Sequence, residues 1–263
     1  ISSTELKKML ASSMGKLEGI RVIVRNEKSV MGESLRMVIL TDYIRREFIS
    51  KIGSGEETSK MGAVPIFETL RSSPTEDGTL GVLSGSTVIL PDQAKEETGR
   101  LAGNEGCSVS FSPLSDTGYS SVSFSGGNKE KVRIVTALFR TGFIRVLIGT
   151  TALLGEGWDS PCVNSLILAS FVGSFMLSNQ MRGRAIRIDP EHPRKVAVIW
   201  HLITPDSSSP YLGEDFISVS RRFDSFLAPD FREDRIRSGI DRLGIRSDMN
   251  IKELDDCNRE MLR

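Results

Sequence analysis

The sequence predicts an α/β fold, in which a mostly parallel sheet is covered by helices on both faces and is followed by a small helical appendage. In the second half of the chain, short segments that are apolar throughout alternate with segments of helical periodicity. Strands of this kind are typical of parallel sheets buried between two layers of helices. The composition, with 39% hydrophobic and 26% charged residues in 263 positions, is that of a globular protein.

The first half of the chain supplies the less regular part of this fold. Residues 1–30 are polar with scattered apolar positions, and we expect a helical lead-in there. The main domain is expected over 31–210, and its first strand is the apolar run RMVIL at 36–40. The elements expected next are helices over 43–52 and 63–71, one or two strands over 80–91, a helix over 92–103 opened by Asp92, and a hairpin or two edge strands over 107–127.

The second half of the chain is more regular. A helix is expected over 128–142, where apolar residues recur at helical spacing and Gly142 can end the helix. Apolar strands are expected over 144–150, 163–170 and 195–203, with a helix before the last of them. The charged tail, 211–263, is expected to form a helical extension.

The composition excludes several classes of protein. The 34 basic residues balance the 34 acidic ones, so any contact with nucleic acid must come from a local patch. Two histidines and three scattered cysteines, with no CxxC or HxxxH spacing, give no reason to expect a metal site. The cysteines favour free thiols in a reducing, cytoplasmic compartment. The sequence has no apolar run of the roughly 18 residues that a membrane span needs, and its abrupt start suggests a piece of a longer protein.

One stretch, NQMRGRAIRID at 179–189, concentrates arginine around a glycine. On a helix, Gln180, Arg184 and Arg187 fall within about 60° of one another. A glycine inside a helix costs about 1 kcal/mol relative to alanine, so Gly183 suggests close approach of another group. The stretch is either a solvated basic face or an anion site, because arginine donates bidentate hydrogen bonds that suit phosphate. The adjacent apolar face is expected to comprise Leu177, Met181, Ala185 and Ile188.

A second stretch, IGTTALLGEGWDSP at 148–161, leaves an apolar strand and is rich in glycine. Glycines let backbone N–H groups approach a phosphate, and Asp159 can accept a hydrogen bond from a ribose hydroxyl. Trp158 is interpreted as a packing residue rather than a base-stacking one. Both stretches follow strands, and open parallel sheets bind ligands beyond the carboxyl ends of their strands.

Together the two stretches resemble a known family. TTALLGEGWDSP is similar to motif V of superfamily 2 helicases, and QMRGRAIR matches their motif VI pattern, Gln-x-x-Gly-Arg-x-x-Arg. RMVILTDY resembles motif IV. The resemblance covers residues 30–205 and points to the second, C-terminal RecA-like domain of a helicase or translocase of the DEAD/DEAH or restriction-helicase type. Motif VI lacks the initial His of true DEAD-box proteins, and Glu156 replaces their motif V Arg, so DNA is favoured over RNA.

The resemblance implies roles for individual residues. Arg184 and Arg187 would be arginine fingers for the γ-phosphate of ATP, and Gln180 would orient the nucleotide or the attacking water. Asp159 would contact the ribose, while Gly157 and Gly183 would line the nucleotide cleft. The sugar–phosphate backbone of a nucleic-acid strand would be held by Thr41, Asp42, Thr150 and Thr151.

The resemblance also implies that half of the ATP site is missing from the chain. No GxxxxGK[ST] phosphate loop occurs, since SMGKLEG at 13–19 has Leu17 where Ser or Thr is required. The phosphate loop and the Mg²⁺ ligands are therefore expected in an N-terminal RecA-like domain of the same parent protein, and this chain alone is expected to be inactive. Two alternatives stay open: a non-catalytic nucleic-acid-binding or regulatory module with the same fold, and a self-contained Rossmann-type enzyme. The latter lacks a GxGxxG turn after its first strand, which runs into TDYIRRE.

Overall fold

The computed structural model describes residues 3–56, 60–150, 158–169, 175–206, 209, 212–230 and 233–261. The chain divides into two compact units, residues 1–200 and residues 201–263. The larger unit contains the sheet, and the smaller one is built mainly from helices and turns.

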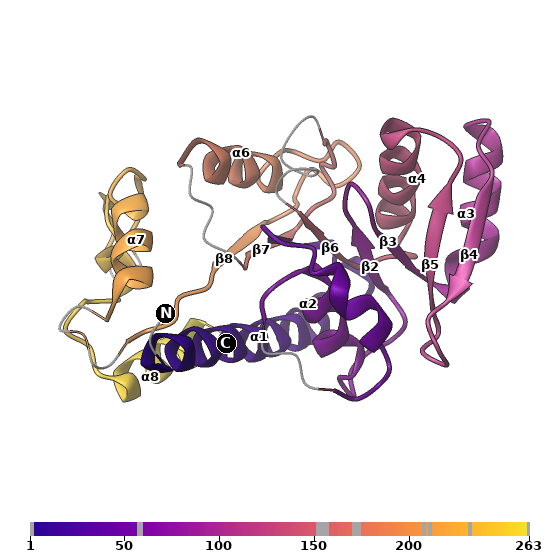
Figure 1. Ribbon diagram of the computed structural model, residues 1–263. Coiled ribbons are helices and arrows are strands. Elements are labelled where there is room, and N and C mark those ends of the chain that lie inside the picture. The colour runs from indigo at the N-terminus through magenta and orange to yellow at the C-terminus, as the bar shows by residue number, and fades with distance from the viewer. Residues whose placement is uncertain are drawn as a thin grey trace. The chain divides into compact units, whose positions relative to one another are not determined.

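The sheet of the larger unit has eight strands in the order β4-β5-β3-β2-β6-β1-β7-β8 (Figure 1). Parallel pairings join β2 to β6, β6 to β1 and β1 to β7, so these four central strands run in one direction. Antiparallel pairings add β3, β5 and β4 at one edge. The strands are β1 (Met37–Thr41), β2 (Leu80–Leu83), β3 (Val88–Pro91), β4 (Val109–Pro113), β5 (Tyr119–Phe124), β6 (Val146–Thr150), β7 (Ser165–Leu168) and β8 (Val198–His201).

The predicted α/β class is confirmed, and the sheet is consistent with the RecA-like domain that the motifs predict. The central strands are buried throughout, as the apolar runs indicated. The predicted strands over 80–91 form the β2–β3 hairpin, and the predicted hairpin over 107–127 is β4–β5 at the edge. The antiparallel share of the sheet is larger than expected, because it includes β3 as well as that hairpin.

Helices cover both faces of the sheet (Figure 1). One face packs against α3 (Lys95–Asn104) and α4 (Asn128–Thr141), with Leu138 and Phe139 fully buried against strand residues such as Leu147. The other face carries α1 (Ser3–Met31) and α2 (Ala63–Arg71). In α1 the buried residues Leu17, Ile20, Ile23 and Val24 recur at helical spacing.

Two local predictions need correction. The segment 43–52 was predicted as an α-helix, but only the 3₁₀ helix η2 (Arg46–Lys51) forms, after Arg45 in a left-handed conformation. Asp92 does not cap a helix. Its carboxylate accepts a hydrogen bond from Ser120 Oγ (2.6 Å) and pairs with Lys95 Nζ (2.9 Å), and α3 begins only after the 3₁₀ turn η3 (Asp92–Ala94). At Asp92, the contacts with Ser120 and Lys95 replace the expected capping geometry.

A polar cluster ties α1 to the sheet near the start of β2. Lys28 Nζ lies 2.8 Å from Asp77 Oδ1, and Thr79 Oγ1 donates to the same carboxylate oxygen at 2.5 Å. Arg145 lies 3.5 Å from the other oxygen. Burial alone raises the pKa of Asp77, but the hydrogen bonds from Lys28 and Thr79 outweigh it and leave the pKa below its ordinary value.

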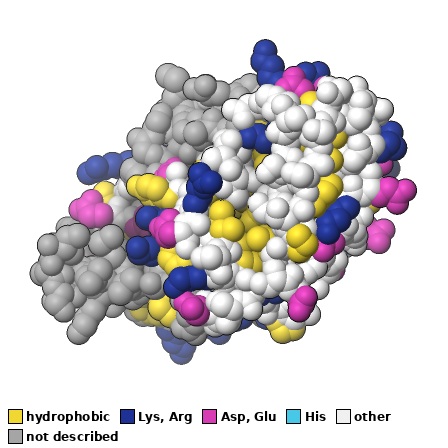
Figure 2. All heavy atoms as spheres, turned by 45° about the vertical axis from the view of Figure 1, so that its right-hand side comes forward, with side chains coloured by type: hydrophobic (Ala, Val, Ile, Leu, Met, Phe, Trp, Pro, Cys, Tyr) yellow, Lys and Arg dark blue, Asp and Glu magenta, His cyan; other side chains and the backbone are white. Residues whose placement is uncertain are grey.

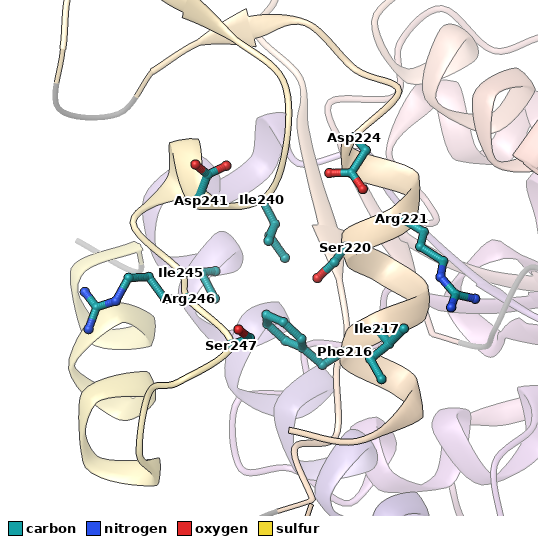
Figure 3. A pocket seen from close by; sticks show the side chains of 10 residues that line it. All are labelled: Phe216, Ile217, Ser220, Arg221, Asp224, Ile240, Asp241, Ile245, Arg246 and Ser247. Carbon is teal, nitrogen blue, oxygen red and sulfur yellow. The ribbon is translucent and has the colours of Figure 1, made fainter. Parts of the chain in front are cut away.

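The smaller unit has its own apolar core, formed by Leu212, Phe216, Val219, Phe223 and Ile240. Its helices are α7 (Glu214–Phe223) and α8 (Ile251–Met261), with the 3₁₀ turn η4 (Asp241–Leu243) between them. These helices agree with the helical extension that the sequence predicts, and β9 (Ala228–Pro229) and β10 (Ile236–Arg237) add a short antiparallel pair. A pocket of about 390 Å³ lies beside α7, lined by Phe216, Ile240 and Ile245 with Ser220 at its wall (Figure 3).

Candidate nucleotide and nucleic-acid site

The carboxyl ends of the central strands bring two predicted residues together. Thr41 ends β1 and Thr150 ends β6, and the two are direct partners in the parallel ladder. Both side chains are buried, with 0% and 6% of their surface exposed. Asp42, the next residue after β1, is exposed. Thr151 and Gly157 lie outside the described residues.

The arginine stretch lies on α6 (Phe175–Ala185), which follows β7 in the chain. Gln180 is exposed on this helix. A Cβ added at Gly183 would meet no described atom within 4 Å. Packing among the described residues therefore does not account for the glycine.

The helix is shorter than the sequence pattern predicted. It ends at Ala185, and Arg187 lies in the turn that follows, where its N–H donates to the Arg184 carbonyl at 3.3 Å. The predicted apolar face is wrong at Ile188, which is 78% exposed, although Ala185 is buried. The side chains of the other two members of that face lie outside the described residues.

Arg187 and Asp159, from the two motif-like stretches, form an ion pair. Arg187 Nη1 lies 2.7 Å from Asp159 Oδ1. Partial burial lowers the pKa of Arg184, the charge of Arg187 lowers it further, and Asp159 acts in the opposite direction. The three charged groups therefore interact electrostatically. Among the described residues, the two guanidinium groups outnumber the one carboxylate, and this arrangement suits an anion.

Lys195 fixes the end of α6 to the segment that carries Asp159. Its ammonium donates hydrogen bonds to the carbonyl oxygens of Pro161, Val163 and Ala185, at 2.5, 2.8 and 2.9 Å. Partial burial lowers the pKa of Lys195. Sequence reasoning missed this residue, because nothing in its neighbourhood indicates that three distant carbonyls converge on it.

Trp158 is a packing residue, as predicted. It is 7% exposed and belongs to the core cluster beneath α4. Its Nε1 donates to Thr136 Oγ1 at 2.8 Å, and its ring lies 6.2 Å from that of Phe139. Arg184 and Trp158 line the same small apolar gap.

A groove of about 700 Å³ lies next to Asp159. It is bounded by α4 residues such as Arg133 and Arg140, by 158–162 and by 189–191. On its floor Asp189 is buried, accepts a hydrogen bond from Glu191 N–H (3.1 Å) and lies 3.0 Å from His192 Nδ1. The oxygen and nitrogen atoms of these three side chains are close enough to share an ion. The hydrogen bonds of Asp189 fall within its own turn, so the cluster is accounted for as local structure.

The cysteines at 107, 162 and 257 are free thiols. Burial raises the pKa of Cys162, and the nearby Ser160 hydroxyl, 3.2 Å away, lowers it. A thiol whose pKa is raised is a weak nucleophile, which agrees with the interpretation of Cys162 as a packed residue. Among the described residues no helix is long and apolar enough to cross a membrane.

Comparison with solved structures shows a structural likeness. No protein-family model matches the chain, and no curated protein does. Among solved structures, the chain is similar to the crystal structure of the C-terminal part of the Fun30 ATPase domain, with 14% identity and a TM-score of 0.42. The match covers 94% of this chain and 52% of that one, so the chain spans about half the length of its structural neighbour. A similarity at this level does not define a function.

Proposed function

We propose that the chain is the C-terminal motor domain of an ATP-dependent nucleic-acid helicase or translocase. The observation that carries the proposal is the convergence of Arg184, Arg187 and Asp159, since these are residues of the two motif-like stretches. The support is chemical as well as positional, because a pair of guanidinium groups with solvent access fits the oxygens of a γ-phosphate.

The residues of this chain act on the charge of the bound nucleotide. ATP supplies the phosphoanhydride bond, and an N-terminal RecA-like domain of the parent protein supplies the phosphate loop and the Mg²⁺ ligands. Arg187 exchanges the carboxylate of Asp159 for a phosphate oxygen, and Arg184 adds a second positive charge. Asp159, once released, is free to accept a hydrogen bond from the ribose. Gln180, exposed on the preceding turn of α6, orients the nucleotide or water.

The nucleic-acid strand, with DNA favoured over RNA, contacts the same edge of the sheet. Asp42 is exposed directly after β1, whereas Thr41 and Thr150 are buried at the ends of β1 and β6 and contribute shape rather than hydroxyl donors. Figure 2 shows side chains of both signs interspersed on one face of the molecule. The contact is therefore local, and it weakens with salt with a log–log slope of about −0.7 for each phosphate neutralised.

Nucleic-acid-stimulated ATP hydrolysis by the parent protein tests the proposal. Arg184→Ala and Arg187→Ala are each expected to lower kcat by roughly 10³–10⁵-fold while nucleotide binding persists, as for the loss of an arginine finger. Arg194→Ala, which removes an exposed arginine just beyond the site, is the matched control and is expected to be active. Normal hydrolysis by both test variants would contradict the proposal.

A non-catalytic module with the same fold is the second candidate. One observation favours it: the ion pair between Arg187 and Asp159 is complete within the chain, as a purely structural contact would be. In that case the two arginine variants change neither hydrolysis nor nucleotide affinity in the parent protein, so the same experiment separates the two candidates.

A further inference from the structure

An exposed aromatic residue lies just beyond the carboxyl end of β1. Tyr43 is 58% exposed, two residues after the last residue of that buried strand. The guanidinium carbon of Arg45 lies 4.7 Å from the centre of its ring, within the range of a cation–π interaction. One face of the ring is thus covered by a cation, and the high exposure leaves much of the remaining ring surface open to solvent.

The backbone holds this pair in place. Arg45 has φ 60° and ψ 54°, a left-handed conformation that costs a non-glycine residue about 1–3 kcal/mol. The carbonyls of Tyr43 and Ile44 accept hydrogen bonds from the first residues of α2, at 2.8 and 3.1 Å. A Cβ at Gly62 would lie 2.3 Å from Arg45 Cγ, so the glycine makes room for the arginine. The stacked pair is therefore organised before any ligand arrives.

The surroundings favour a flat ligand that carries negative charge. Arg45 already covers the ring, so a second cation would be repelled, while Glu47 neutralises Arg45 only weakly at 3.8 Å. The next residue, Arg46, is exposed and, with Glu47, lines a groove of about 480 Å³ between η2 and the turn after β4. A nucleobase has the π-face that stacks on tyrosine and arginine, and its phosphates suit the arginine beside the groove.

We propose that Tyr43 and Arg45 form a stacking platform for a base of single-stranded nucleic acid, with Arg46 contacting the neighbouring phosphate. This proposal rests on the nucleic-acid part of the proposed function, and it assigns the base contact to residues other than Thr41 and Thr150. Stacking is tolerant of sequence, because every base has a π-face. The platform therefore binds strands without reading their sequence.

Binding of a fluorescein-labelled oligothymidylate to the 263-residue chain, followed by fluorescence anisotropy at low salt, tests the platform. Tyr43→Ala is expected to weaken binding about 5- to 150-fold, the range for loss of one stacked base. The affinity of Tyr43→Phe is expected to stay within about twofold of that of the unsubstituted chain. The unsubstituted chain and Tyr43→Ala should bind the same oligonucleotide with abasic sites equally well. Thermal melting checks that the variants fold.

Three results would overturn the platform: no binding by the unsubstituted chain, unchanged binding by Tyr43→Ala, or an equal loss of affinity by Tyr43→Ala on the abasic strand. The outcome is distinguishable from failure of the motor proposal. If Arg187→Ala leaves hydrolysis in the parent protein unchanged while Tyr43→Ala loses base-dependent binding, the motor assignment fails and the platform stands.

Discussion

Replacing Lys195 by methionine is expected to destabilise the larger unit. The substitution keeps the length of the side chain but removes the ammonium that bonds three carbonyls between 2.5 and 2.9 Å away. A hydrogen bond to a charged group contributes about 1.5–3 kcal/mol, and the acceptors here share one partly exposed donor. We therefore expect a total loss of about 2–3 kcal/mol. For a unit of this size that corresponds to a fall in Tm of roughly 4–12 °C.

Thermal unfolding followed by circular dichroism measures this effect. Lys129→Met, the same change at an exposed position, is the matched control and is expected to leave Tm unchanged. Lys195→Arg retains the charge and is expected to recover part of the loss. A Tm for Lys195→Met within about 1 °C of the parent would refute the reasoning, because the three contacts would then contribute nothing.

Three further predictions concern charge and packing. Asp77 has a folded-state pKa below its ordinary value, so its stabilisation is complete above the unfolded pKa near 4 and is lost as the pH falls through the folded pKa. Urea unfolding at pH 7 and about pH 3.5 should therefore show that Asp77→Asn loses less unfolding free energy in acid than the unsubstituted chain does. An equal loss by the two chains would count against this prediction. Arg187→Ala and Asp159→Asn break an ion pair whose side chains are 53% and 56% exposed, so each should change the unfolding free energy by less than about 1 kcal/mol. A larger loss would show that the pair has a structural role. Gly62→Ala places a Cβ 2.3 Å from Arg45 Cγ, so it should lower the free energy of unfolding in urea by about 1–3 kcal/mol and weaken oligonucleotide binding. An unchanged unfolding free energy would mean that the loop adapts.

The sequence was sufficient for the parts of the fold that depend on local periodicity. The central strands and α4 could be predicted, because an apolar run or a 3.6-residue period is a property of neighbouring residues. The end of α4 was predictable for the same reason, since Gly142 adopts the left-handed conformation that a helix C-cap favours. The antiparallel placement of β3 beside β5 was not, because strand order depends on contacts between distant segments.

The sequence suggests the members of the candidate site but not their geometry. The motif-like stretches identify Arg184, Arg187 and Asp159, and the ion pair between two of them agrees with a common location. Helical periodicity could not show that α6 stops at Ala185, because the carbonyl there bonds to Lys195, ten residues further along the chain. Tyr43 was missed because a single aromatic residue in a turn has no periodic signature.

Trapping of a transition-state analogue tests the central claim most directly. An arginine finger binds the transferring phosphoryl group more tightly in the transition state than in the ground state. The parent protein should therefore bind ADP with aluminium fluoride far more tightly than its Arg187→Ala variant does, while the two bind ATP with similar affinity and Arg194→Ala behaves as the parent. If Arg187→Ala binds the analogue as tightly as the parent, Arg187 is not a finger and the motor assignment is contradicted.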